Sequence, residues 1–261
     1  MATTPTGSSL QVLKAVEDGW NAFCKAPWSF LLFQILVGVV TLPFIGIAVL
    51  GGARIAAVKE VAGLNTGGLH PVLGYLLLVV GLIGYIIVVL WGIVGLIRGA
   101  WTALNGQKPD FTVFTRWDQT SSWRLLGSLI LYIVVVAVAS VIAYLIGLGL
   151  GQINQALIWI PSIALAIFAI WFLVTQQFLV QNSLLGSKNS ANALSSGIDV
   201  INPSWWIVLW LLIVEAVIHA IAATFHYGGL FVMVPAMVCI STAAYRQLFG
   251  STDNTGLLKP N

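Results

Sequence analysis

Long apolar runs separated by short polar connections dominate the pattern of the chain. A membrane-crossing helix needs roughly 20 mostly apolar residues. The six runs that reach this length cover residues 28–50, 72–97, 124–149, 157–181, 205–225 and 228–249. Residues 1–9 and 251–261 are rich in Thr, Ser, Gly, Asn and Pro, so they are predicted to be disordered tails. The pattern predicts an all-α integral membrane protein with one six-span domain over residues 10–250.

Similar motifs recur at the ends of these runs. The second, fourth and sixth runs end in Leu-x-Gly, and a glycine just past a helix is a common C-terminal cap. These glycines are Gly106, Gly186 and Gly250. The first, third and fifth runs begin at tryptophans, which favour the membrane interface. The predicted interface anchors are Trp28, Trp123, Trp205 and Trp206.

A short amphipathic segment precedes each of the odd-numbered runs, and such segments lie in the plane of the membrane interface. They cover residues 9–25, 110–118 and 190–201. Together with the recurring ends, they predict a six-helix bundle built as three helical hairpins with cytoplasmic interfacial amphipathic helices. The alternative is that Leu-x-Gly and Trp recur by chance in a chain rich in Leu, Gly and Trp.

The distribution of basic residues predicts the orientation of the chain. Of the eleven Lys and Arg residues, all except Arg54 and Lys59 fall on one side of the predicted membrane. Short cytoplasmic connections carry the excess of Lys and Arg in membrane proteins. Both termini are therefore expected in the cytoplasm of a multi-pass protein.

Glycines line one face of the second run. At 100° per residue these positions fall within a narrow arc. They are Gly74, Gly81, Gly84, Gly92, Gly95 and Gly99. Small residues let membrane helices approach closely, so this face is expected to pack against another helix. The neighbour is either a helix of the same chain or, through the GxxxG pair at Gly95 and Gly99, a second copy.

Composition supports the membrane assignment and excludes several functional classes. The chain has 59% apolar and 7% charged residues and a mean hydropathy of +0.99, far from the norm of soluble domains. A net charge of +3 is too small for nucleic-acid binding. Two cysteines and three histidines argue against a disulfide framework and a His- or Cys-rich metal cluster. Because no catalytic or phosphate-binding motif is present, we expect no enzyme, cofactor or metal.

Glu215 is the outstanding polar residue because it lies near the middle of the fifth run. Helical spacing predicts that it shares an inward face with His219, Ala222 and His226. Ionisable residues inside a membrane are often functional, so Glu215, His219 and His226 are a candidate site for a proton, an ion or a lipophilic ligand such as a tetrapyrrole. The alternative is a hydrogen-bonded pair that fixes helix packing. Gln34, Gln176, Gln177 and Gln181 are expected to make interhelical hydrogen bonds.

Several segments resemble a broad bacterial group of polytopic membrane proteins of unknown function, similar to the membrane domain attached to some glycerophosphoryl diester phosphodiesterases. The segments are Asn192-Ala-Leu-Ser-Ser-Gly, Asn202-Pro-Ser-Trp-Trp, 228–235, Ala243-Ala-Tyr-Arg-Gln-Leu and 99–114. The resemblance implies a six-helix bacterial membrane protein without known catalytic residues. The phosphodiesterase domain is absent, so its activity is not transferred, and Glu215 and His219 lie outside the shared pattern.

Three functional hypotheses follow from these patterns. The first is a non-enzymatic membrane protein that scaffolds or assists a membrane complex or organises the bilayer. Its partners would be the lipid bilayer and other membrane-protein subunits, with no nucleic acid, in a bacterial plasma membrane or internal membrane. The second is a carrier for a small solute or proton that uses Glu215 and His219. The third is a subunit that binds a pigment or another lipophilic ligand.

Overall fold

The computed structural model describes residues 10–61, 71–224 and 226–258, and the predicted N-terminal tail lies outside them. The long helices are α2 (Pro27–Val61), α3 (Pro71–Leu104), α5 (Gln119–Ile153), α6 (Trp159–Thr175), α9 (Trp205–Thr224) and α10 (His226–Phe249). The shorter ones are α1 (Val12–Lys25), α4 (Phe111–Thr115), α7 (Leu179–Gln181) and α8 (Ser190–Ile201). The described residues form no strand, and six of their helical segments are long and apolar enough to cross a membrane. The all-α class and the six candidate spans are confirmed.

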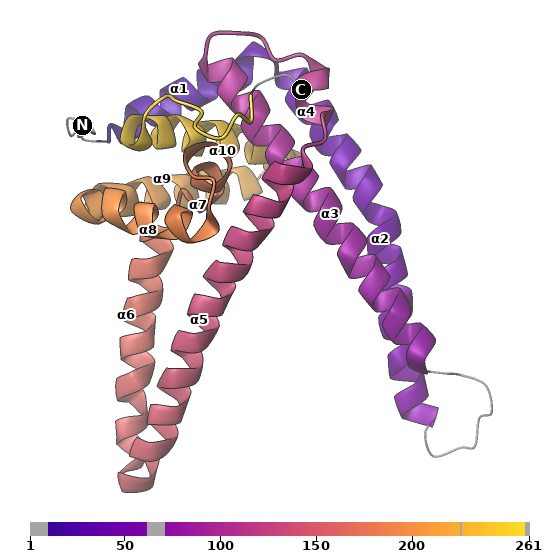
Figure 1. Cartoon of the computed structure of the whole chain (residues 1–261), viewed down its shortest axis with the longest axis vertical. Coiled ribbons are helices and arrows are strands. Elements are labelled where there is room, and N and C mark those ends of the chain that lie inside the picture. The colour runs from indigo at the N-terminus through magenta and orange to yellow at the C-terminus, as the bar shows by residue number, and fades with distance from the viewer. Residues whose placement is uncertain (1–9, 62–70, 225, 259–261) are drawn as a thin grey trace.

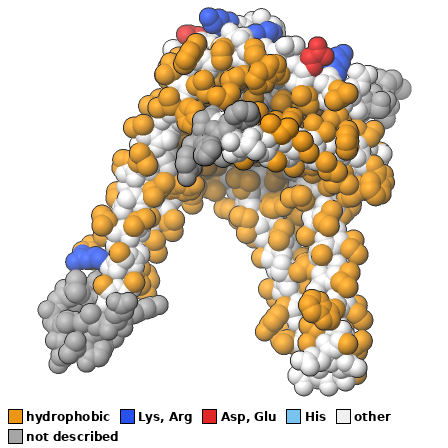
Figure 2. Space-filling model, turned by 180° about the vertical axis from the view of Figure 1, so that it is seen from behind, with side chains coloured by type: hydrophobic (Ala, Val, Ile, Leu, Met, Phe, Trp, Pro, Cys, Tyr) orange, Lys and Arg blue, Asp and Glu red, His pale blue; other side chains and the backbone are white. Residues whose placement is uncertain are grey.

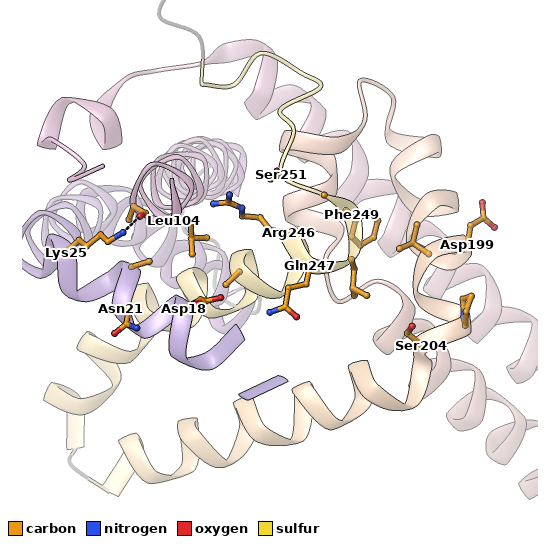
Figure 3. A pocket seen from close by; sticks show the side chains of 17 residues that line it. Asp18, Asn21, Lys25, Leu104, Asp199, Ser204, Arg246, Gln247, Phe249 and Ser251 are labelled. Atoms are coloured by element: carbon orange, nitrogen blue, oxygen red, sulfur yellow. Dashed lines mark hydrogen bonds between the residues drawn. The ribbon is translucent and has the colours of Figure 1, made fainter. Parts of the chain in front are cut away.

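Two long hairpins form diverging legs (Figure 1). One leg consists of α2 and α3, and the other of α5 and α6, with the helices of each leg packed together. Helices α1, α8 and α10 run across the ends where the legs meet. Helix α9 packs against α10. Figure 3, which looks along the legs, shows that α9 begins beside Ser204 and also runs across the ends of the legs. The third pair of helices therefore differs in direction from the other two, and the prediction of three equivalent hairpins is not confirmed.

The glycine face of α3 is an interface inside the chain. A Cβ atom added at Gly81 would lie 2.5 Å from the backbone nitrogen of Ala48 in α2, and one at Gly84 would meet the ring of Phe44. Gly74 and Gly92 also face α2, whereas the Cβ positions of Gly95 and Gly99 meet Phe114 of α4 and, for Gly95, Phe33 of α2. Of the two expectations, the structure places this face against helices of the same chain. The missing side chains allow the backbones of α2 and α3 to touch.

The buried core lies where the legs meet. One cluster of buried side chains includes Trp101, Phe178 and Tyr245, and a second includes Phe33 and Phe114. Away from this junction the legs expose large apolar side chains along their length, while charged groups gather on the outer surface of the junction (Figure 2). Apolar surface of this kind is what lipid covers in a membrane.

The C-terminal residues 251–258 are folded, which corrects the prediction of a disordered tail there. The Asp253 carboxylate accepts hydrogen bonds of 2.9 Å from the backbone N–H groups of Gly256 and Leu258. This turn inserts Leu257 into the core, where its side chain is 1% exposed. Polar composition suggested disorder, but one carboxylate with several donors closes a compact turn instead.

Candidate functional site

Polar side chains gather where the fourth span breaks. The sequence pattern predicts a helix to residue 181, yet α6 ends at Thr175 and is followed by a turn, by α7 and by a π-helical turn over Asn182–Gly186. Thr175 and Gln176 are buried here, as are Gln181 and Asn182. The break is explained by the partners of these side chains, because their bonds reach other helices and fix the local backbone. A buried polar group is costly unless it is hydrogen-bonded.

The side-chain amides at the break join α8 and α10. Gln176 Nε2 donates to the carbonyl of Leu194 in α8 at 3.1 Å. Gln181 Nε2 donates to Ser241 Oγ of α10 at 2.8 Å. Asn182 Nδ2 donates to the carbonyl of Ala193 at 2.7 Å. Gln176 and Gln181 therefore make the interhelical hydrogen bonds expected of them, and they tie α8 and α10 to the end of the second leg. The prediction is not confirmed for Gln34, whose Oε1 has no hydrogen-bond partner among the described residues.

Glu215 belongs to the same polar network. Gln177 Nε2 donates to Glu215 Oε2 at 2.8 Å. The residue is 9% exposed, and its Oε1 has no hydrogen-bond partner among the described residues. Val208, Leu211 and Ala222 are the other buried residues of α9, so the inward face contains Glu215 and Ala222 as predicted. The carboxyl group can hold helix packing through Gln177 and still offers one oxygen to a proton or a donor.

The structure does not bring the predicted His219 into this site. His219 is exposed, and the His226 side chain lies outside the described residues. Beyond Glu215 most positions of α9 are exposed, so helical spacing alone does not place His219 in the protein interior. The predicted inward position of His219 is wrong for this physical reason. Within the described parts of the chain, no three His, Cys, Asp or Glu side chains are placed to hold a metal ion.

The predicted tryptophan anchors lie at the end of the molecule where the helices meet. Trp28, Trp123 and Trp206 are exposed, and Trp205 is half-buried. Trp205 donates its indole N–H to the carbonyl of Trp171 at 3.4 Å. Exposed rings at the beginning of α2, α5 and α9 are suited to the lipid headgroup level. Their role as anchors stays a prediction.

A second polar cluster, centred on Arg98, was missed by sequence reasoning. Arg98 is 2% exposed, although it lies within the helix α3. Its Nη1 donates to the carbonyls of Arg116 at 2.9 Å and Val113 at 3.2 Å. Its Nε donates to the carbonyl of Leu257 at 3.3 Å. The sequence does contain one indication of a buried Arg98. The residues from Arg98 to Leu104 are mostly apolar, which indicates that Arg98 lies inside the helix and not in the connection that follows.

Arg116 and Asp118 complete the Arg98 cluster. Arg116 Nη2 donates to the same Leu257 carbonyl at 2.6 Å. Asp118 Oδ2 lies 3.7 Å from Arg98 Nη2, while the Asp118 carboxylate also caps α5 by accepting from the Ser121 N–H at 2.9 Å. Arg98 Nη2 has no hydrogen-bond partner among the described residues. Two guanidinium groups thus meet at one uncharged carbonyl oxygen.

The Asp253 turn adds a titratable group outside the candidate spans. Burial raises the pKa of Asp253, but hydrogen bonds from Leu258, Thr255 and Gly256 outweigh it and hold the pKa below its ordinary value of 3.8. Hydrogen bonding to the charged form stabilises that form. The carboxylate is therefore charged over the physiological pH range and keeps the turn closed.

The largest cavity that we describe lies between α1, α8 and the ends of α3 and α10 (Figure 3). Its volume is about 1010 Å³. Two cations on its wall already have partners: Lys25 Nζ donates to the Ala103 carbonyl at 2.9 Å, and the Arg246 guanidinium lies 4.9 Å from the centre of the Trp101 ring. These contacts hold α1 and α10 at the end of α3.

Comparisons with known proteins identify no relative. No protein-family model, curated protein or solved structure matches the chain. The resemblance to bacterial polytopic membrane proteins therefore stays a prediction. The features that bear on function are the shape of the molecule and two polar clusters. These are the network at Glu215 and the Arg98 cluster.

Proposed function

We propose that the chain is a non-enzymatic membrane protein that organises the bilayer because it is wider at one end than at the other. We call this shape the wedge. The observation that carries this proposal is the direction of the third helix pair. Helices α9 and α10 lie across the ends of the two legs together with α1 and α8, whereas at the opposite end only the two separate hairpins remain (Figure 1). The protein then occupies more area in one leaflet than in the other.

Unequal area in the two leaflets favours a curved membrane, and interfacial amphipathic helices act in the same direction because their binding is curvature-sensitive. The amphipathic α1 supports this role. It buries Val12, Ala15 and Gly19 on one face, and the opposite face of the helix is exposed. Gly19 lies directly against α10, where an added Cβ would be 2.4 Å from the Cα of Ile240. Helix α1 is thus attached to the helices that cross the legs.

The orientation belongs to the same proposal. Charged side chains gather at the wide end of the molecule (Figure 2). Arg54 lies in the C-terminal part of α2, towards the opposite end. The excess of Lys and Arg favours the cytoplasm for the wide end and for both termini, in a bacterial plasma membrane or internal membrane. The wider side of the wedge is then in the cytoplasmic leaflet.

Reconstitution into lipid vesicles tests the wedge. Purified wild-type protein is expected to convert large vesicles into smaller or tubular ones, as seen by electron cryo-microscopy. The variant Gly19→Val should lose most of this effect because its side chain would push α1 away from α10. Gly38→Val is the matched control, since a Cβ there meets nothing within 4 Å. Wild-type vesicles that match protein-free vesicles, or a Gly19→Val variant that remodels them equally, would refute the proposal.

A second candidate function, proton transfer, rests on one observation. Glu215 Oε1 is buried and has no partner among the described residues, so this carboxyl group has room to bind and release a proton. Vesicles containing a pH-sensitive dye test this function directly. Wild type should dissipate a pH gradient faster than empty vesicles and Glu215→Gln should not. Equal rates for all three exclude a proton path through Glu215.

A further inference from the structure

A small cavity adjoins the Arg98 cluster at the wide end of the molecule. Its volume is about 460 Å³, and it lies between the end of α3, the connection to α4 and the C-terminal segment. Its polar lining consists of Arg98, Arg116, Thr102, Thr112, Asn105 and Gln107. No carboxylate lines it among the residues that the structure describes. The cavity is therefore lined by positive charge and by amide and hydroxyl groups.

The positive charge at this cavity is only partly compensated. Arg98 and Arg116 share the Leu257 carbonyl, which carries no net charge. The carboxylate of Asp118 lies 3.7 Å from Arg98 Nη2, beyond hydrogen-bond distance, and its oxygens already accept bonds from Ser121. A buried charge without a close partner is costly, and an anion that binds beside it removes part of this cost.

The chemistry of the lining selects the kind of anion. A guanidinium group presents a planar set of N–H donors that matches the oxygens of a phosphate group. Arg98 is buried, with only 2% of its surface exposed, and its Nη2 has no hydrogen-bond partner among the described residues. Asn105 and Gln107 are exposed and add side-chain N–H donors at the cavity.

We propose that this cavity binds a phosphate group, held by Arg98 and Arg116. The group belongs either to an anionic lipid headgroup or to a soluble phosphate, since both present the same oxygens. Arg98 is fixed by three bonds to main-chain carbonyls, whereas the Arg116 guanidinium makes one such bond, to Leu257, and has further N–H donors for the anion. The site does not depend on the proposed wedge, because it rests on the charges and not on the direction of α9 and α10.

Binding measurements on the purified full-length chain in mild detergent test the site. The two probes are inorganic phosphate and mixed micelles containing phosphatidylglycerol, with micelles of phosphatidylcholine, a zwitterionic lipid of zero net charge, as the reference. Arg116→Gln removes one guanidinium and leaves the main-chain bonds of Arg98 in place. Lys108→Gln is the matched control, because it removes one positive charge from the connection between α3 and α4 without lining the cavity. Arg116→Lys keeps the charge and loses the paired donors.

The expected result is saturable binding of at least one probe by wild type. Affinity should fall about tenfold or more in Arg116→Gln, fall less in Arg116→Lys, and stay within twofold in Lys108→Gln. Binding of phosphatidylglycerol alone identifies a lipid headgroup, and binding of inorganic phosphate identifies a site for the phosphate group itself. The proposal is overturned if neither probe binds, if Arg116→Gln binds like wild type, or if Lys108→Gln loses as much affinity as Arg116→Gln.

Discussion

The contact between α2 and α3 allows a quantitative test with two alanine substitutions. In Gly81→Ala the new Cβ would lie 2.5 Å from Ala48 N and 2.7 Å from Phe44 O. Both are backbone atoms, so the helices must separate. In Gly46→Ala, on the exposed side of α2, the new Cβ meets nothing within 4 Å. Both changes replace Gly by Ala inside a long helix, so the gain in helix propensity is the same for the two and cancels in the comparison.

Over-packing a close contact costs about 1–3 kcal/mol, which should be the difference in free energy of unfolding between these two variants. For a protein of this size each kcal/mol shifts the melting temperature by about 2–4 °C. We therefore expect Gly81→Ala to melt several degrees below Gly46→Ala in the same mild detergent, measured by circular dichroism or by the fluorescence of a thiol-reactive dye. If the two variants melt at the same temperature, the α2–α3 contact described above is wrong.

Three further predictions address the orientation, the polar network and the C-terminal turn. Reporter fusions after Gly106 should score cytoplasmic and those at Gly151 external; any reversal contradicts the proposed orientation. Glu215→Leu should change the free energy of unfolding by no more than about 1 kcal/mol, because it removes one hydrogen bond together with an unpartnered buried oxygen. His219→Leu should change it less because His219 is exposed, and thermal melts measure both. Because hydrogen bonds depress the pKa of Asp253, its stabilising effect is full above the ordinary pKa of 3.8 and is lost as the pH falls through the lower folded value. Protection factors of the amides in the turn, which correct for the intrinsic exchange rate at each pH, should therefore fall in acid, and constant factors from pH 5 down to about pH 1 would contradict this.

The spans and the glycine face could be predicted from the sequence because both depend on local patterns. About twenty apolar residues in succession predict a span without any knowledge of the neighbouring helices. The period of the α-helix likewise puts Gly74 and Gly81 on one side of the helix. The neighbour of this face could not be assigned by spacing alone. The structure supplies it through the contacts of Gly51 and Ala48, which lie in α2.

The partners in the polar clusters could not be predicted because they are far apart in the sequence. Gln177 bonds to Glu215 across 38 positions, and Arg98 bonds to Leu257 across 159. Helical spacing offered His219 as the neighbour of Glu215, but a side chain three or four positions away is buried only where another helix covers it. Composition likewise could not reveal that Asp253 closes a turn, since the same polar residues are typical of disordered ends.

The C-terminal turn has a consequence for the order in which the protein is built during synthesis. Each leg consists of helices adjacent in the sequence, so each can enter the membrane on its own. The C-terminal segment adds the last bonds at the junction of the legs. The Leu257 carbonyl accepts from Arg98 and Arg116 beside the first leg, and the Asn254 N–H donates to the Leu185 carbonyl beside the second, at 2.9 Å. A chain still on the ribosome therefore lacks these bonds, and the C-terminal turn adds them to the contacts between α3 and α5 only after residues 251–258 have emerged. A protease that cuts within this segment would remove these bonds at the junction while the contacts between α3 and α5 remain.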